Sequence, residues 1–134
     1  MPENNLPTIY RAYIDCLNGQ DFDRLGQFVH NDVEYNGERI GLPGYREMIE
    51  GDFVAIPDLF FDVRLLFCDP PVVASRLRFD CTPVGMLFGM PVNGTRVVFE
   101  ENVFYQFADG KIRAVWSIID KAAIAEQVDG DRPR

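Results

Sequence analysis

The feature that most constrains the fold is a pair of long strand-like runs near the C-terminal end, joined by a tight turn. The first run extends from Thr95 to Phe107 and the second from Ile112 to Asp120. The four residues between them, Ala108-Asp109-Gly110-Lys111, include an Asp-Gly pair typical of a hairpin. Trp116 and Asp120 share a parity on the second run. We expect both to face a pocket whose walls are built by the residues before them.

Length and charge narrow the class of protein. The chain of 134 residues is predicted to be a single domain over 1–134, with an ordered core of about 6–128. Hydrophobic residues make up 47%, enough for a sizeable core, and a formal charge of -8 argues against nucleic acid or an anionic membrane as partner. No apolar run is long enough to span a bilayer. Three widely spaced cysteines predict reduced thiols in a cytoplasmic protein and no zinc site.

The first half of the chain is predicted to be mainly helical. A broad apolar face and the flanking Pro7 and Gly19 indicate a helix from Pro7 to Asn18. A short second helix is expected over Phe22 to Phe28, followed by a short strand, Val33 to Tyr35. Apolar residues at helical spacing predict a further helix from Tyr45 to about Ala55.

The second half is predicted to consist of strands. Leu59 to Cys68 alternates, with Phe61, Val63, Leu65 and Phe67 on one parity, and Val72 to Thr82 follows the Asp69-Pro70-Pro71 turn. The runs Thr95 to Phe107 and Ile112 to Ile119 complete a meander, and Lys121 to Val128 adds a short helix. The order predicts an α+β fold in which a strongly curved sheet wraps around the N-terminal helices and leaves a cavity at its mouth.

The second half also carries motifs that resemble those of the SnoaL-like polyketide cyclase family. The segment from Arg78 to Gly94 contains the Gly-x-Pro-x-x-Gly element of that family, at Gly89 to Gly94. An Asp-Gly-Lys-Ile hairpin tip begins at Asp109, and a Trp is followed four residues later by an Asp, as Trp116 is by Asp120. The order and spacing of these motifs extend the resemblance over nearly the whole chain.

The resemblance implies both a fold and a chemistry. The fold would be the cone-shaped α+β barrel of the nuclear-transport-factor-two-like superfamily, with a mixed or antiparallel sheet. The chemistry would be intramolecular aldol cyclisation or a related isomerisation of a small or medium apolar carbonyl compound, without metal or cofactor. Asp120 matches the acid/base residue of the family. The His of the family would fall at Pro83, so the chemistry would rest on Asp120 alone or differ from that of the family cyclases.

The candidate site is centred on Asp120, whose carboxyl pKa an apolar pocket would raise towards the working pH. The alternative is that Asp120 is an N-cap for the helix that follows. Six further residues are expected to contact substrate: Trp116, Tyr13, Tyr35, Asn102, Phe53 and Met90. Trp116 is open to a second interpretation as a core residue. Asn102 fits a solvated sheet face equally well.

The sequence is also compatible with two other functions, and it predicts a homodimer. A non-catalytic module of the same fold would bind a hydrophobic ligand or only pair with itself. An epoxide hydrolase-like site would combine Asp120 with Glu100 or Glu101. The apolar stretch that contains Met86, Phe88 and Met90 is either a lid over the ligand or a subunit interface. We expect a homodimer that pairs through the sheet.

Overall fold

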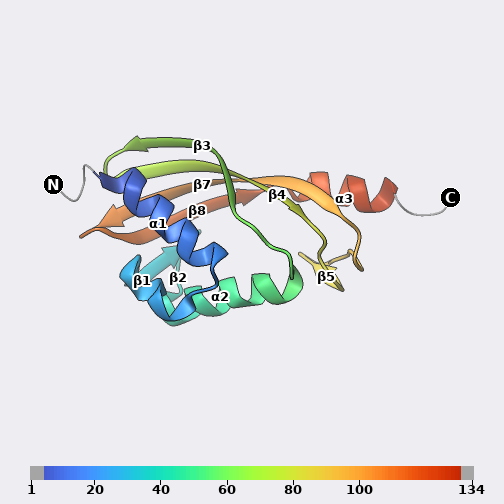
Figure 1. Cartoon of the computed structure of the whole chain (residues 1–134), viewed down its shortest axis with the longest axis horizontal. Coiled ribbons are helices and arrows are strands. Elements are labelled where there is room, and N and C mark those ends of the chain that lie inside the picture. The colour runs from blue at the N-terminus through green and yellow to red at the C-terminus, as the bar shows by residue number, and fades with distance from the viewer. Residues whose placement is uncertain (1–4, 131–134) are drawn as a thin grey trace.

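The computed structural model describes residues 5–130. Within this range the chain forms helices at both ends and a group of strands between them (Figure 1). The helical segments are α1 (Leu6–Asn18), η2 (Phe22–Gln27), α2 (Gly41–Ala55) and α3 (Lys121–Gly130). The strands are β1 (Val29–Tyr35), β2 (Glu38–Arg39), β3 (Asp62–Asp69), β4 (Val72–Cys81), β5 (Met86–Leu87), β6 (Met90–Pro91), β7 (Val97–Ala108) and β8 (Lys111–Ile119).

Most of these strands belong to one mixed sheet. In the described part of the chain the sheet has six strands in the order β2-β1-β8-β7-β4-β3. The β1–β8 pair is parallel, whereas the neighbouring pairs along the rest of the sheet are antiparallel. The short strands β5 and β6 form a separate hairpin. The long β7–β8 hairpin therefore occupies the middle of the sheet, as its length in the sequence predicts.

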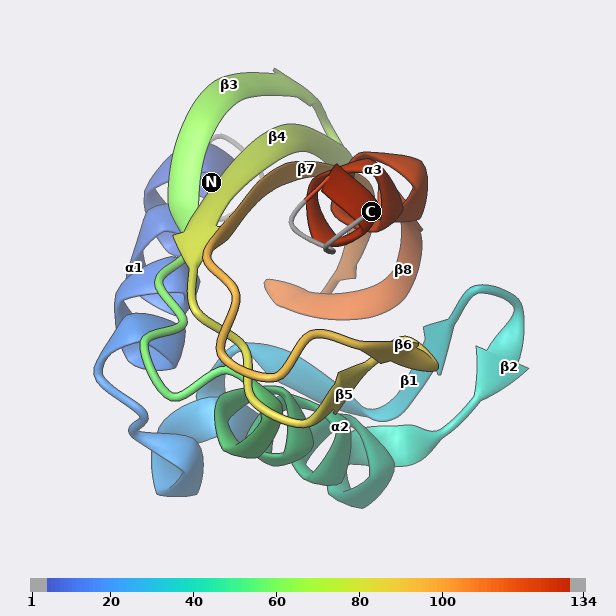
Figure 2. The same cartoon turned by 90° about the vertical axis from the view of Figure 1, so that its right-hand side faces the viewer.

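The sheet curves strongly around the helices and is not closed (Figure 2). Strands β3, β4, β7 and β8 arch over one side, α2 lies opposite them, and the β5–β6 hairpin crosses the open end. Inward-facing β4 and β7 residues such as Leu77 and Val103 are buried, as are Leu6 and Leu17 of α1. This arrangement confirms the predicted cone-shaped α+β fold with a curved mixed sheet around the N-terminal helices.

Two β-bulges change which side chains face the helices. The pairing of β3 with β4 shifts between Val63 and Leu65, so Leu65 and Phe67 point outward although Phe61 on the same parity is buried. The β7–β8 pairing shifts between Gln106 and Phe107. A bulge adds one residue to one strand and so reverses the alternation beyond it. The prediction that Phe61, Val63, Leu65 and Phe67 share one face was therefore wrong.

The start of α2 depends on a glycine. Gly41 has a φ of +69°, and a Cβ at this position would lie 3.2 Å from the backbone oxygen of Asn31. Any other residue would be strained at this positive φ, and its Cβ would also crowd the Asn31 oxygen. Only glycine therefore fits here without rearrangement. The tight entry begins α2 four residues before the predicted start at Tyr45 and seats it against β1.

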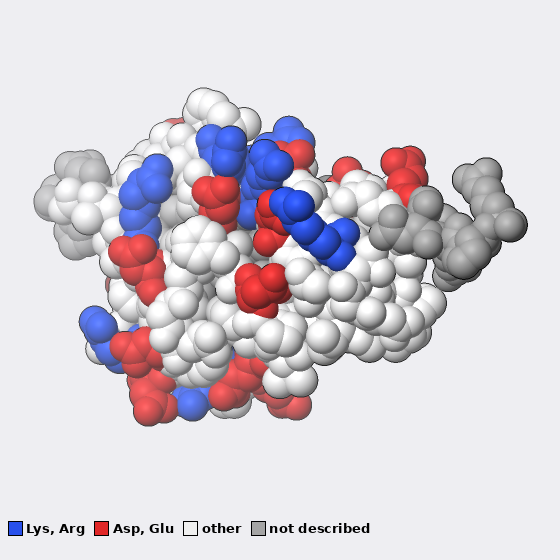
Figure 3. Space-filling model, turned by 45° about the vertical axis from the view of Figure 1, so that its right-hand side comes forward, with Lys and Arg blue, Asp and Glu red and all other residues white. Residues whose placement is uncertain are grey.

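The surface shows how charge is distributed around this fold. On the face shown in Figure 3, basic and acidic side chains alternate along the upper edge and mix again along the lower edge. Several exposed charges of the protein are paired, for example Arg96 with Asp80 at 2.7 Å and Arg76 with Glu100 at 2.8 Å. Among the described residues on this face, basic side chains lie beside acidic ones, unlike the continuous basic stripe that binds a phosphate backbone. Among the helices within residues 5–130, none is both long and apolar enough to cross a membrane.

Candidate active site

A cavity of about 340 Å³ lies between the concave face of the sheet and the helices. Its volume is near the lower end of the range for small-molecule pockets. Most of its wall is apolar or aromatic, and its polar residues come from α1, α2, the β1–β2 turn, β7, β8 and the start of α3. The lining residues are Tyr13, Tyr35, Asn36, Tyr45, Met48, Ile49, Asp52, Ile56, Leu59, Phe61, Phe79, Phe88, Phe99, Glu101, Val103, Tyr105, Val115, Ser117, Ile119 and Lys121.

Two carboxyl groups line this apolar cavity. Asp52 lies on α2, three residues after Ile49 and four before Ile56, so it belongs to the apolar stripe that faces the sheet. Glu101 lies in the middle of β7, opposite Leu77 on β4 and Ile119 on β8. Cross-strand neighbours share a face of the sheet, and this register directs Glu101 inward. A helix and a strand thus bring two acids into one apolar chamber.

The environment favours the neutral form of both acids. Burial raises the pKa of Asp52 from 3.8 to about 7, and the nearby Glu101 carboxylate contributes to the increase. Burial also raises the pKa of Glu101, and a hydrogen bond from the Ser117 hydroxyl opposes that increase. Each raised pKa has the same main cause, which is the cost of a charge in an apolar wall. With a pKa of about 7, Asp52 can both hold and release a proton at neutral pH.

A polar group beside Glu101 fixes its orientation. The Ser117 hydroxyl donates a hydrogen bond to a Glu101 carboxylate oxygen, and the Ser117 backbone N–H donates to Asn36 Oδ1 at 2.8 Å. Asn36 itself is anchored by its backbone N–H, which donates to Val115 O at 2.8 Å. Tyr35 precedes it in the wall, and burial raises its pKa. The β1–β2 turn and β8 together support one side of the carboxyl pair.

Phenol groups line another part of the cavity. The Tyr13 and Tyr45 hydroxyls lie 2.6 Å apart and form a buried hydrogen bond between α1 and α2. The Tyr105 ring lies 5.9 Å from the Tyr13 ring, centroid to centroid. Burial raises the pKa of Tyr13, Tyr45 and Tyr105, so each phenol stays protonated at neutral pH. A protonated phenol can donate a hydrogen bond to a carbonyl or enolate oxygen.

The mouth of the cavity carries a different pair of residues. Phe88, at the tip of the β5–β6 hairpin, has a φ of +52°, and Gly89 beside it has a φ of +78°. A bulky residue in the left-handed region is uncommon and needs support from its surroundings. Lys121, the first residue of α3, places its Nζ 5.0 Å from the centre of the Phe88 ring. Both residues line the cavity and are exposed, which places them where the cavity opens to solvent.

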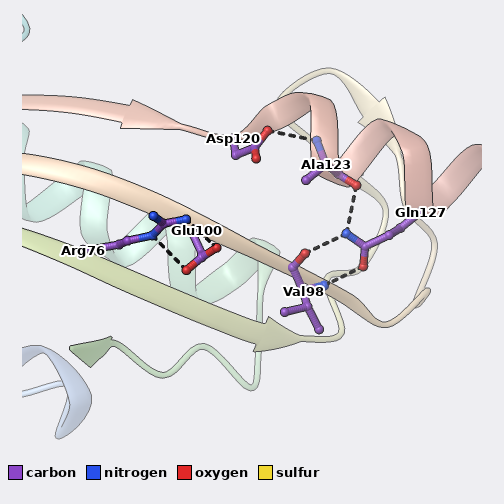
Figure 4. Close-up of polar contacts among 6 residues, drawn as sticks. All are labelled: Arg76, Val98, Glu100, Asp120, Ala123 and Gln127. Atoms are coloured by element: carbon purple, nitrogen blue, oxygen red, sulfur yellow. Dashed lines mark hydrogen bonds and ion pairs between the residues drawn. The ribbon is translucent and has the colours of Figure 1, made fainter. Parts of the chain in front are cut away.

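Asp120, the predicted acid/base residue, lies outside this wall. It is exposed, and its Oδ1 accepts a hydrogen bond from the Ala123 backbone N–H at 3.1 Å (Figure 4). The Asp120 backbone N–H donates to Glu100 O at 3.0 Å, and the Glu100 side chain pairs with Arg76 outside the cavity. The residues that line the cavity do not include Asp120. Its position is that of the N-cap, which was the alternative interpretation.

The six predicted substrate contacts fall into three groups. Tyr13 and Tyr35 line the cavity. Trp116 and Asn102 are exposed on the opposite, convex face of the sheet, where they border a separate shallow hollow. The other two are packed near the cavity but not in its wall: Phe53 lies against Phe22 and Phe61, and Met90 is a partly buried hairpin residue beside the core.

Asp52 is the functional candidate that sequence reasoning missed. The signal was present, because an aspartate at helical spacing from Met48, Ile49 and Ile56 interrupts an apolar stripe. Glu101 was considered only as a possible member of an epoxide hydrolase-like site. The structure instead turns Glu100 outward to an ion pair with Arg76 and Glu101 inward to the cavity. Adjacent strand residues point to opposite faces, so only one of them could enter.

Comparison with known proteins gives a consistent result. Residues 7–128 match the sequence profile described as "SnoaL-like polyketide cyclase". A SnoaL-like polyketide cyclase from Agrobacterium tumefaciens strain C58 is 53% identical, with 92% of this chain and 97% of that chain covered and a TM-score of 0.90. A comparison with curated protein sequences found no match.

More distant structures share the fold. TsrD from Streptomyces laurentii is 20% identical, with a TM-score of 0.82 over 93% of this chain and 95% of that chain. IdmH from Streptomyces antibioticus is 17% identical, with a TM-score of 0.81 over 92% of this chain and 98% of that chain. At these identities the likeness establishes the architecture alone.

Proposed function

Because the chain belongs to the SnoaL-like polyketide cyclase family, we propose that it is a cofactor-independent enzyme acting on a small or medium apolar carbonyl compound. The reaction class is intramolecular aldol cyclisation or a related isomerisation. One observation carries the proposal, which is the pair of partly buried carboxyls, Asp52 and Glu101, in an apolar cavity. Such a pair supplies a base and an acid in one chamber.

The chemistry begins with a proton transfer. The ionised carboxyl of the pair removes a proton from the carbon next to the substrate carbonyl, and the electrons of that C–H bond form an enolate. A phenol of the Tyr13–Tyr45 pair donates a hydrogen bond to the enolate oxygen. In a cyclisation, the enolate carbon bonds to a second carbonyl carbon of the same molecule. The resulting alkoxide takes a proton from the protonated carboxyl, which restores the total charge of the pair.

This assignment does not require a histidine at Pro83. Pro83 is buried, accepts a hydrogen bond from the Gly94 N–H at 2.8 Å, and does not line the cavity. Two carboxyls whose pKa values are raised in one apolar cavity can act as an acid and a base. The Asp52–Glu101 pair therefore replaces Asp120 as our proposed centre of the chemistry.

The test is an exchange reaction that needs no knowledge of the natural substrate. 2-Tetralone is an apolar bicyclic ketone whose α-protons exchange with D₂O, and NMR follows the loss of their signal. We expect the wild-type protein to accelerate exchange over matched buffer. Asp52→Asn and Glu101→Gln should each reduce the acceleration by about 10²- to 10⁴-fold, the range for removal of a general acid or base. The proposal would be contradicted if the α-protons of 2-tetralone exchanged no faster with wild-type protein than in matched buffer.

A binding module of the same fold is the second candidate function. The exposed, helix-capping position of Asp120 favours it, because the carboxyl that matches the family's acid/base residue does not line the cavity. Such a module would bind 2-tetralone without catalysing exchange. The exchange measurement, combined with a titration of the ketone that follows NMR signals of cavity residues, separates the two functions.

We also propose that the convex face of the sheet pairs two copies of the chain. Residues in register across four strands form an outward row, because Phe67 pairs with Ala74, Ala74 with Phe104, and Phe104 with Trp116. Their large side chains are well exposed, as is Ile118 beside them: Phe67 67%, Phe104 54%, Trp116 45% and Ile118 74%. A contiguous apolar strip of this kind is typical of an interaction surface. A second copy presents the same strip and covers it symmetrically.

A further inference from the structure

The entrance of the cavity carries a positive charge that the acid–base chemistry does not use. Among the described residues that line the cavity, Lys121 is the one with a cationic side chain. The chain has two lysines, and the other, Lys111, begins β8 at the far end of the β7–β8 hairpin. No carboxylate among the side chains of residues 5–128 lies within ion-pair distance of Lys121. Its partner in the structure is the face of the Phe88 ring.

The charges inside the cavity have the opposite sign. Asp52 and Glu101 line it together with Lys121, and the protein as a whole carries a formal charge of -8. A ligand with an anionic group would be repelled if that group approached the two acids. The same group would be attracted at the entrance, where Lys121 is exposed and has a charge free to pair. The cavity therefore holds one exposed cation together with two partly buried acids.

We propose that Lys121 is a specificity-determining residue that selects carbonyl compounds with a carboxylate at one end. The carboxylate binds Lys121 at the mouth, and the apolar body lies against Phe88 and the aromatic wall. This orientation directs the opposite, carbonyl-bearing end towards Asp52 and Glu101. The selection of an acidic ligand rests on Lys121 and the cavity alone, and its catalytic consequence rests on the proposed function.

The test compares two ligands that differ in charge and little in shape. 2-Naphthylacetate carries the carboxylate, and 2-naphthylacetamide is its neutral counterpart. Calorimetry at low salt measures the two dissociation constants, and NMR signals from Ile56 and Val103 report whether each ligand enters the cavity. We expect the wild type to bind the acetate about three- to fivefold more tightly, as for an exposed ion pair. The preference should shrink as salt is added.

Two lysine variants form the matched comparison. Lys121→Met keeps the length of the side chain and removes the charge, so the preference for the acetate should disappear while the amide binds as before. Lys111→Met removes the same charge from the protein at a distance from the cavity and should keep the preference. Equal affinity of the wild type for both ligands, or a preference that survives in Lys121→Met, would overturn the proposal. Equal losses in both variants would also overturn it, since net charge would then be the cause.

The binding measurement and the exchange measurement can refute the two proposals independently of each other. If Asp52→Asn keeps the exchange activity while the Lys121-dependent preference is observed, the proposed reaction at the carboxyl pair falls and the binding site at the mouth stands. If exchange depends on Asp52 while the acetate and amide bind equally, the reaction stands and the selection of acids falls. The two measurements therefore assign any failure to one end of the cavity.

Discussion

The raised pKa of Asp52 predicts a specific dependence of protein stability on pH. Its pKa of about 7 in the folded protein, against an ordinary value of 3.8, corresponds to roughly 4 kcal/mol of preference for the neutral carboxyl. Because the folded state holds this proton more tightly than the unfolded chain, the contribution is fully present below pH 3.8 and is lost as the pH rises to about 7. Ionisation of Asp52 therefore destabilises the fold.

The substitution Asp52→Asn removes this titration while keeping the size of the side chain. The free energy of unfolding of the wild type should fall relative to that of the variant by roughly 2.5 kcal/mol between about pH 5 and about pH 8. Urea unfolding at both pH values, followed by circular dichroism, measures the difference. The matched control is Asp109→Asn, because Asp109 is an exposed residue with a φ of +55°, a conformation that asparagine also tolerates.

The control should show no comparable divergence from the wild type. A wild-type minus Asp52→Asn difference that stays constant between the two pH values would refute the reasoning. A wild type that gains stability over the variant as the pH rises would refute it more strongly, because Asp52 would then be stabilised as an anion.

Three further predictions concern separate parts of the structure. Tyr45→Phe leaves the buried Tyr13 hydroxyl without its partner, and urea unfolding should show a loss of about 1–3 kcal/mol that is largely recovered when Tyr13→Phe is added. Asp120→Ala removes the side-chain acceptor at the start of α3 and should cost about 1 kcal/mol of stability, whereas Asp120→Asn should cost little. Phe104→Asp places a charge in the convex apolar strip, and sedimentation should show monomer where the wild type is a dimer; a monomeric wild type at micromolar concentration would contradict the proposed pairing.

The fold could be predicted because its signals are local and repeated. Proline and glycine bracket α1, and alternating apolar residues define β4 and β7 to within a few residues of their observed ends. The bulges could not be predicted, since a single added residue leaves no mark in the composition of a strand. In β3 the shift at Arg64 turned Leu65 and Phe67 outward, which an uninterrupted alternation would have placed beside Phe61.

The candidate site was harder to predict because both faces of β8 are apolar. One parity carries Trp116 and Ile118, and the other carries Val115 and Ile119. Alternation shows that the two sets are separate without showing which one faces the helices. The larger side chains lie on the convex face, the reverse of the usual expectation for a core. Asp120, which shares their parity, was therefore expected in the cavity and lies outside it.

The place of Asp52 in the candidate site was hard to predict for a second reason, which is that its partner is distant in the sequence. Its helical spacing within an apolar stripe could have been recognised, but its partner Glu101 is 49 positions later in the chain. Only the curvature of the sheet brings β7 over α2. The pKa of each carboxyl is raised because the folded cavity surrounds it with apolar groups, so neither sequence segment alone indicates the increase.

The central claim is that the carboxyl pair inside the cavity, and not the helix-capping Asp120, carries the acid–base chemistry. The most direct measurement compares the exchange of 2-tetralone α-protons catalysed by Asp52→Asn and by Asp120→Asn. Both variants remove one carboxylate and keep its shape. We predict that the Asp120→Asn variant catalyses exchange of the ketone α-protons at nearly the wild-type rate. The Asp52→Asn variant should catalyse the same exchange about 10²- to 10⁴-fold more slowly. The opposite order, with Asp120→Asn inactive and Asp52→Asn active, would contradict it.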